Sequence, residues 1–323
     1  PPVIAIELVG VQPMTGPVGQ IHTLRVRYSD TVGSGASGAT AGEEALSPFK
    51  IAEAYSGNAT TGKADNTAVL EGAAGNKLSI QILKQTVEAK TRKLSARWTF
   101  EAAQDAQSMH GIDVEAEIMA ALAQEITAEI DQEVIASLNT LAGSAGQTYD
   151  QAAVSGTATF VGDEHAALAV QINRVSNQIA QRTRRGAGNW AVVSPFALTI
   201  LQSATTSAFA RTTEGSFEAP TNTKMVGTLN NAMKVYVNTY AADSANVLIG
   251  YKGSSESDAA AFYCPYIPLM SSGVVLDPST FEPTVSFMTR YGYIELSNTA
   301  SSLGNAADYL GAVAITNANV SFS

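Results

Sequence analysis

The chain has 323 residues, enough for two domains or for one elaborate domain. Charged residues make up 15% of it, against about 25% in an average soluble protein. The 29 acidic and 19 basic residues leave a formal charge of −10, which argues against a surface that binds nucleic-acid phosphates. The shortage of charge favours a subunit that hides much of its exterior against partners, with a plain soluble protein as the alternative.

The single cysteine, Cys264, excludes a disulfide framework within the chain and a cysteine-based zinc cluster. We expect it to be a small buried apolar residue. No apolar run approaches the roughly 18 residues that indicate a membrane-spanning helix, so no membrane partner is expected. The sequence starts at Pro1 without a methionine or a signal-peptide pattern, which predicts a processed N-terminus.

The N-terminal part predicts an arm followed by a strand. Residues 1–20 begin with an extended segment containing a short strand at Ile4–Val11, and a turn rich in proline and glycine follows. Polar and apolar residues alternate over Ile21–Tyr28, which is typical of a half-buried strand. The inner face of that strand is expected to carry Leu24, Val26 and Tyr28.

A second region of strand character follows at Lys77–Phe100. Between the two regions, residues 29–76 are rich in small and polar residues, with too few large apolar ones for a core. Residues 21–100 therefore predict an extended loop with a polar excursion. A monomer has no reason to hold such a loop out in water, but the loop gains stability if it lies on a neighbour.

The strongest local signal is a helix over Asp113–Leu141, which contains neither proline nor glycine. Asp113 can cap its first turn and Gly143 can end it. At about 1.5 Å per residue the helix is roughly 42 Å long. Its expected core positions are Ile118, Leu122, Ile126, Ile130, Val134 and Leu138.

These apolar positions recur at a constant spacing of four, and each step overshoots a full turn by about 40°. The apolar stripe therefore winds by about 200° around the helix instead of covering one fixed face. We interpret the helix as a spine that meets different neighbours along its length. A coiled coil is the alternative, but it needs an average spacing of about 3.5.

Residues 144–162 are loop-like, with a short strand at Thr157–Val161. A second helix is expected at Glu164–Arg182, capped by Asp163 and closed by Gly186 in the left-handed conformation. Its expected apolar face consists of Leu168, Ile172, Val175 and Ile179. A buried strand at Trp190–Val193, a short helix from Ser194 to about Ala204 and several β-strands complete an α+β chain.

Motifs for catalysis are weak. Gly33–Gly38 fits the GxGxxG pattern of dinucleotide sites, but Pro48 interrupts the helix that such a site needs, so a loop tip is the better interpretation. The histidines His22, His110 and His165 form no HExxH motif, and no GxSxG occurs. We expect His165 to be exposed. The sequence thus predicts no enzyme, no metal and no cofactor.

Charged residues supply the candidate assembly contacts. They are Arg92, Arg97, Glu125, Glu129, Arg182, Arg184 and Arg185. The last three follow one another at the end of the second helix. They can pair with carboxylates of a neighbouring subunit, or they can complement the dipole of their own helix, and the two interpretations have equal weight.

Seven phrases of the sequence occur together in one order. They are Leu8–Val18 (LVGVQPMTGPV), Ser108–Glu117 (SMHGIDVEAE), Glu125–Ile135 (EITAEIDQEVI), Arg182–Trp190 (RTRRGAGNW), Gly250–Ser255 (GYKGSS), Phe262–Leu269 (FYCPYIPL) and Thr289–Gly292 (TRYG). In this order the chain resembles the major capsid proteins of T-even-type tailed bacteriophages over about residues 6–295.

The resemblance implies the Hong Kong 97-type capsid fold. The expected parts are an N-terminal arm at 1–20, an extended β-loop at 21–100, the spine helix and peripheral domain at 101–185, an axial domain at 186–275 and C-terminal strands at 276–323 that return to the peripheral domain. Members of this family typically lose an N-terminal propeptide, which suits a chain starting at Pro1. T-even-type relatives carry a folded insertion domain on the extended loop, which residues 29–76 are too polar to form.

By the same resemblance, the chain is expected to form the hexamers and pentamers of an icosahedral or prolate head that encloses the genome. Assembly would occur in the host cytoplasm and the product would be the virion capsid. Further partners would be portal, vertex, decoration and scaffolding proteins, with packaged DNA contacted only non-specifically. An encapsulin-like compartment shell and a nucleotide-dependent enzyme using Gly33–Gly38 are the alternatives.

Overall fold

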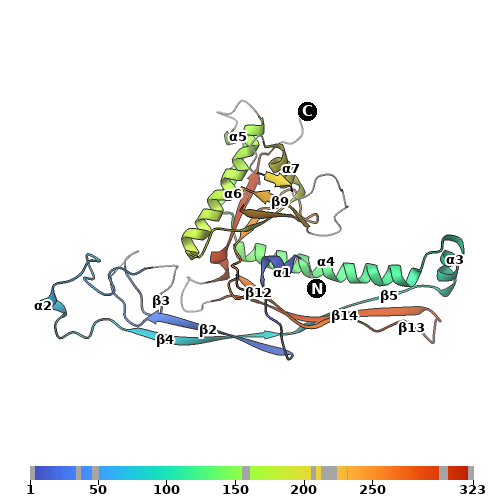
Figure 1. The fold of residues 1–323 in the computed structure, drawn as a ribbon, viewed down its shortest axis with the longest axis horizontal. Helices are drawn as coiled ribbons and strands as arrows, with labels where there is room; N and C mark the ends of the chain where they lie inside the picture. Colours follow the sequence, from blue (N-terminus) through green and yellow to red (C-terminus); the bar gives the residue numbers. More distant parts are fainter. Residues whose placement is uncertain are drawn as a thin grey trace.

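The computed structural model describes residues 4–33, 38–45, 51–154, 161–204, 209–211, 224–230, 232–297 and 305–318. Figure 1 shows an elongated molecule, with a long hairpin at one end, a long helix lying along a sheet, and a second sheet with its helices on the side of the long helix away from the hairpin. Within the described residues no helix combines the length and the apolar character that crossing a bilayer requires.

The helices and strands have the following bounds. The described helices are α1 (Ala5–Leu8), α2 (Thr67–Leu70), α3 (Phe100–His110), α4 (Val114–Ala142), α5 (Gln151–Val154), α6 (Val161–Thr183) and α7 (Pro195–Ser203), and a 3-10 turn spans Ala306–Tyr309. The strands are β1 (Gly10–Val11), β2 (Val18–Tyr28), β3 (Glu44–Ala45), β4 (Leu78–Glu88), β5 (Lys90–Arg97), β6 (Gln147–Asp150), β7 (Trp190–Val193), β8 (Phe209–Arg211), β9 (Lys224–Leu229), β10 (Met233–Val237), β11 (Val247–Gly250), β12 (Ala261–Ser271), β13 (Val275–Leu276), β14 (Pro283–Glu295) and β15 (Leu310–Thr316).

The long hairpin consists of β2 and β4, which pair antiparallel over their whole length. The register runs from Val18 opposite Glu88 to Tyr28 opposite Leu78. At its base β4 continues into β5, which pairs with β14 in the sheet beneath the long helix. The hairpin is thus a projection of the main body, anchored at one end only.

The long helix α4 confirms the strongest sequence signal. The Asp113 carboxylate accepts hydrogen bonds from the backbone N–H groups of Glu115 (3.1 Å) and Ala116 (3.5 Å), and the helix ends at Gly143, whose φ is 65°. Five of the six expected core positions are buried, namely Leu122, Ile126, Ile130, Val134 and Leu138. Ile118, nearer the exposed end, is half-buried.

Helix α4 packs against a five-stranded sheet formed by β1, β12, β14 and β13 in that order, with β5 also paired to β14. Farther along it contacts β15 and the 3-10 turn, and at its start it contacts α3. The neighbours therefore change along the helix, as expected for a winding apolar stripe. One apolar cluster joins the helix, the sheet and the arm.

A seven-stranded sheet forms the second part, with the order β6-β15-β11-β7-β10-β9-β8. The central strand β7 is buried at every position, and α6 contacts the sheet through the apolar face expected from the sequence. That face, Leu168, Ile172, Val175 and Ile179, is buried. Ser194 caps α7 by accepting from the backbone N–H of Ala197 at 3.2 Å.

The two sheets do not coincide with the domains expected from the sequence, whose boundaries lie between residues 185 and 186 and between residues 275 and 276. Helix α6 and strand β6 belong to the seven-stranded sheet together with the strands after residue 186. Strand β15 also lies in that sheet, between β6 and β11, and does not return with β14 to the five-stranded sheet. The composition of each sheet depends on pairing between strands that lie far apart in the chain, and local sequence patterns do not indicate such pairing.

The arm differs from the strand expected at Ile4–Val11. Ala5–Leu8 form one helical turn, and only Gly10–Val11 are extended, pairing in parallel with β12. The turn brings Ile4 and Leu8 within about 6 Å along the axis, against about 13 Å in a strand. Both side chains therefore enter the same apolar cluster, where they are buried.

The start of α6 also differs from expectation. The helix begins at Val161, so Asp163 lies in its first turn; residues 155–160, which include most of the strand expected at Thr157–Val161, are outside the described residues. His165 is 1% exposed, which contradicts the expected exposure. Its Nδ1 contacts Ser203 Oγ because α7 packs against α6, a long-range contact that the local sequence does not report.

The end of α6 is closed by another residue than expected. Arg184 adopts the left-handed conformation (φ 51°), and Gly186 does not. Gly186 serves close packing instead, because a Cβ at this position would lie 2.7 Å from the ring of Tyr251.

Candidate assembly surfaces

The hairpin carries a bare apolar face. Leu24 lies opposite Ile82, and the next pair on the same face is Val26 opposite Ile80. Leu24, Ile80 and Ile82 are 66%, 71% and 67% exposed. Strand β3 extends this sheet near the tip, where it pairs with Val26 and Arg27 of β2. Exposed apolar side chains grouped on one face in this way indicate a contact surface.

The other half of that face, near the hairpin tip, is covered by the polar excursion. The rings of Tyr28 and Tyr55 lie 4.5 Å apart, and Ala39 and Ala45 are buried beside them. Residues 29–76, which were expected to have too few large apolar residues for a core, thus bury Tyr55 and two alanines in a small cluster. This cluster also explains why, of the three residues expected on the inner face, only Tyr28 is buried.

The opposite face of β2 is unexpectedly well covered. Arg25 and Arg27 are 5% and 4% exposed. Arg25 forms an ion pair with Glu44 of β3, and Arg27 Nη1 donates to the carbonyl of Gly42 at 3.1 Å. The excursion therefore also folds back over the two arginines, and Leu24, Ile80 and Ile82 stay exposed on the other face.

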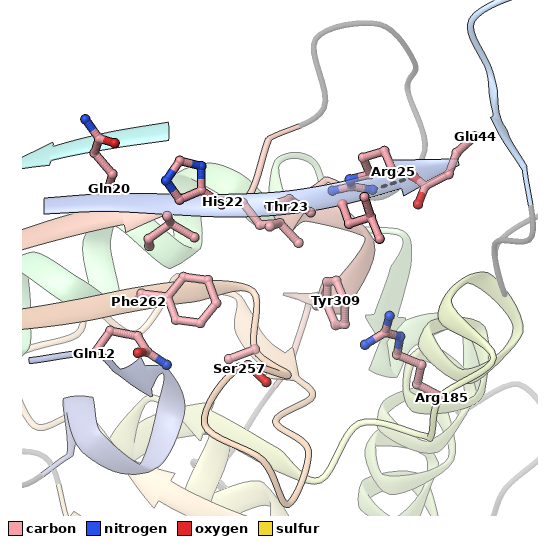
Figure 2. A pocket seen from close by; sticks show the side chains of 14 residues that line it. Gln12, Gln20, His22, Thr23, Arg25, Glu44, Arg185, Ser257, Phe262 and Tyr309 are labelled. Atoms are coloured by element: carbon pink, nitrogen blue, oxygen red, sulfur yellow. Dashed lines mark hydrogen bonds and ion pairs between the residues drawn. The ribbon is translucent and has the colours of Figure 1, made fainter. Parts of the chain in front are cut away.

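A groove separates the hairpin from the main body. Figure 2 shows β2 with Gln20, His22 and Arg25 along one side, and Phe262, Ser257 and Tyr309 on the other. Its volume is about 440 Å³. Only the base of the hairpin, where Ile21 and Val87 meet Phe262, packs on the body.

A second apolar surface lies at the other end of the molecule, at α3 and the β13–β14 connection (Figure 1). Its exposed apolar residues are Phe100, Met109, Ile112, Val274, Val275, Leu276 and Phe281. The rings of Phe100 and Phe281 lie 6.1 Å apart, so residues from two elements share this surface. The elongated chain thus presents apolar groups at both ends.

Two of the expected assembly contacts pair within the chain. Arg92 of β5 bonds to Glu129 at 3.0 Å and to Glu133 at 2.7 Å, and its Nε donates to the Tyr291 hydroxyl at 2.7 Å. Burial acts to lower the pKa of Arg92, but the bonds to Glu133 and Tyr291 outweigh it and raise that pKa. The guanidinium stays charged and ties the strand at the base of the hairpin to the spine helix.

Replacing Arg92 by alanine is expected to lower the free energy of unfolding by about 1 kcal/mol, because it removes a bridge between strand and helix. The matched control is Arg97→Ala, since Arg97 is 72% exposed and has one partner, Glu282, at 3.5 Å. That change is expected to lower the free energy of unfolding by less than about 0.5 kcal/mol. Urea unfolding measures both, and equal losses would contradict the bridging role of Arg92.

Two of the arginines at the end of α6 and directly after it, Arg182 and Arg185, also bond within the chain. Arg182 Nη2 donates to the Leu310 carbonyl at 2.8 Å, and Arg185 pairs with Asp258 at 2.8 Å. Both bonds join the end of α6 to segments far along the chain, while the contacts expected with a neighbouring subunit remain predictions. Arg184 and Glu125 are exposed and remain candidates for contacts between subunits.

The described residues contain no group of three or more His, Cys, Asp or Glu placed to hold a metal ion. Burial raises the pKa of the Cys264 thiol to about 11, so it is protonated and inert at neutral pH. Residues 34–37 of the glycine motif lie outside the described residues. In the described stretches after it, the first helix is the four-residue α2, which does not fit a dinucleotide site.

Comparison with known proteins decides the family. A family model described as "Major capsid protein Gp23" matches residues 1–318. The chain belongs to the Gp23 major capsid protein family. It is 30% identical to the major capsid protein of Vibrio phage KVP40, over 95% of this chain and 77% of that protein. It is 31% identical to the major capsid protein of Enterobacteria phage T6, over 90% and 75%.

Solved structures agree on the Hong Kong 97-type fold. A chain of Microbacterium phage Oxtober96 matches with a TM-score of 0.57 and 12% identity, over 97% of this chain and 90% of the other. The mature capsid of bacteriophage PhiM1 matches with a TM-score of 0.51 and 12% identity, over 96% and 86%. This member of the Gp23 family is a major capsid protein of tailed phages and a component of the virion capsid.

The Gp23 relatives are longer than this chain. The alignment with the KVP40 protein runs over 397 positions, whereas the chain has 323 residues, so it includes positions that this chain lacks. The relatives compared are phage capsid proteins, and nothing favours the encapsulin-like alternative.

Proposed function

We propose that copies of this chain assemble head-to-tail into the hexamers and pentamers of a phage head. The supporting observation is the pair of apolar surfaces at opposite ends of one elongated molecule. Because the surfaces differ, the contact between copies is heterologous, and such contacts close into rings when the rotation between subunits allows. Leu24, Ile80 and Ile82 of one subunit would be covered by the next subunit.

The chain would act as a structural subunit and not as an enzyme. No motif of the sequence supplies a nucleophile with its base, and the surface of a shell protein needs none. Its net charge of −10 keeps it from adhering to packaged DNA, which it would contact only non-specifically. Portal, vertex, decoration and scaffolding proteins are the further partners of this proposal.

Deleting residues 31–74 tests the role of the extended loop. The hydrogen bond from the Ser29 N–H to the Lys77 carbonyl (3.0 Å) shows that the chain ends beside the deletion lie close together. We therefore expect the shortened hairpin to form and the chain to fold, but to assemble poorly. Circular dichroism checks the fold and electron microscopy checks the shells. Normal shells from the shortened chain would contradict the proposed role of the loop.

A further inference from the structure

A separate apolar pocket lies between the spine helix and β12, away from both apolar ends. Its volume is about 180 Å³. Ile126 and Ile130 of α4 form its floor, and they are 2% and 3% exposed. The segment Pro265–Leu269 of β12 forms the opposite wall.

The pocket exists because β12 leaves its regular register at this point. The pairing with β14 shifts between Pro265 and Ile267 and again between Ile267 and Met270. Pro265 and Pro268 have no N–H group to donate to the neighbouring strand, which favours such bulges. The irregular strand leaves this space beside the helix, while Tyr263 and Leu269 of β12 pack in the same apolar cluster as Ile126 and Ile130.

Two hydroxyl groups beside the pocket form hydrogen bonds within the chain. Thr127 Oγ1 donates to the Ala123 carbonyl at 2.9 Å, and Thr289 Oγ1 donates to the Ile267 carbonyl at 3.0 Å. Arg290 lies over the ring of Tyr266, 5.1 Å from its centroid, and holds this part of the wall. The lining is mainly aliphatic and aromatic, so the pocket suits an apolar occupant.

We propose that this pocket binds a small apolar molecule about the size of one aromatic ring. An engineered apolar cavity of about 150 Å³ binds benzene, and the volume of this pocket, which opens to solvent, is similar. Such a ligand would contact both the middle of the spine helix and the bulged strand. All residues that line the site come from one subunit.

Photolabelling tests the proposal on the full chain, as monomer or as shell. The probe is 3-trifluoromethyl-3-phenyldiazirine, a one-ring apolar compound that labels its surroundings on illumination, and mass spectrometry locates the label. We expect labelling of Ile126–Ile130 and of Pro265–Leu269 together, reduced at least fivefold by excess indole. Label spread over the exposed apolar residues of the hairpin, with no excess at the pocket, would overturn the proposal.

Substitutions distinguish binding of the probe in the pocket from non-specific binding of the probe to exposed apolar surface. Thr127→Phe places a ring in the pocket and is expected to reduce the labelling of the pocket at least fivefold. If that variant does not fold, Ile267→Trp fills the pocket from the side of β12 and replaces it in the test. The matched control is Gln124→Phe, an exposed position on the same helix that does not line the pocket. Unchanged labelling in a folded filling variant would refute the site. Labelling in monomers but not in shells would assign the pocket to a neighbour's side chain and overturn the small-molecule proposal.

Discussion

Replacing both Ile126 and Ile130 by aspartate is expected to prevent folding. Both side chains are nearly fully buried in the apolar cluster that joins the spine helix to the five-stranded sheet. Burying an unpaired carboxylate costs several kcal/mol, and two of them approach the whole stability of a typical protein, about 5–15 kcal/mol. The expected result is insoluble protein, or soluble protein without a cooperative thermal transition.

Glu125→Ala is the control for this change, because Glu125 is exposed on the same helix. Its effect on the free energy of unfolding should stay within about 0.5 kcal/mol. Soluble, cooperatively melting protein from the double aspartate variant would show that the middle of α4 is not a core position.

Replacing Ile80 and Ile82 by lysine is expected to abolish shell formation and leave the subunit folded. The two side chains are 71% and 67% exposed, so the change alters stability little in the isolated chain. In an assembled shell the proposal covers them by the next subunit, where two uncompensated charges would be desolvated. Sedimentation velocity measures assembly, and thermal melting checks the fold.

The matched control changes Ser79 and Gln81 to lysine. These residues alternate with the isoleucines on β4 and point to the other face, and both are exposed. They add the same charge, and we expect shells to form. If the two variants assemble equally well or equally badly, the apolar face of the hairpin is not the contact surface.

Helices were easier to predict than strand environments. The bounds of α4 follow from the capping carboxylate of Asp113, the absence of proline and glycine within it, and the ending at Gly143, all of which act within a few residues. The faces of β2 did not follow. Alternation put Leu24 and Val26 on the buried side, but the polar excursion covers Arg25 and Arg27 instead.

The partners of the charged candidate residues were also only partly predictable from the sequence. The sequence singled out Arg92 and Glu129, and the structure places them in one cluster. It did not indicate Glu133 and Tyr291 as their partners, because Tyr291 reaches the cluster only through the pairing of β14 with β5. Arg185 likewise meets Asp258, 73 residues away in the chain.

The sequence by itself determined the spine helix, the apolar face of α6, strands such as β7 and β11, and the family, because caps, periodicity and characteristic phrases are local properties. Tertiary structure alone decided that β15 joins the seven-stranded sheet, that His165 is buried under α7 and that the pairing of β12 with β14 shifts register. These features depend on backbone pairing and packing between distant segments. Their energy comes from contacts that exist only once the chain has folded.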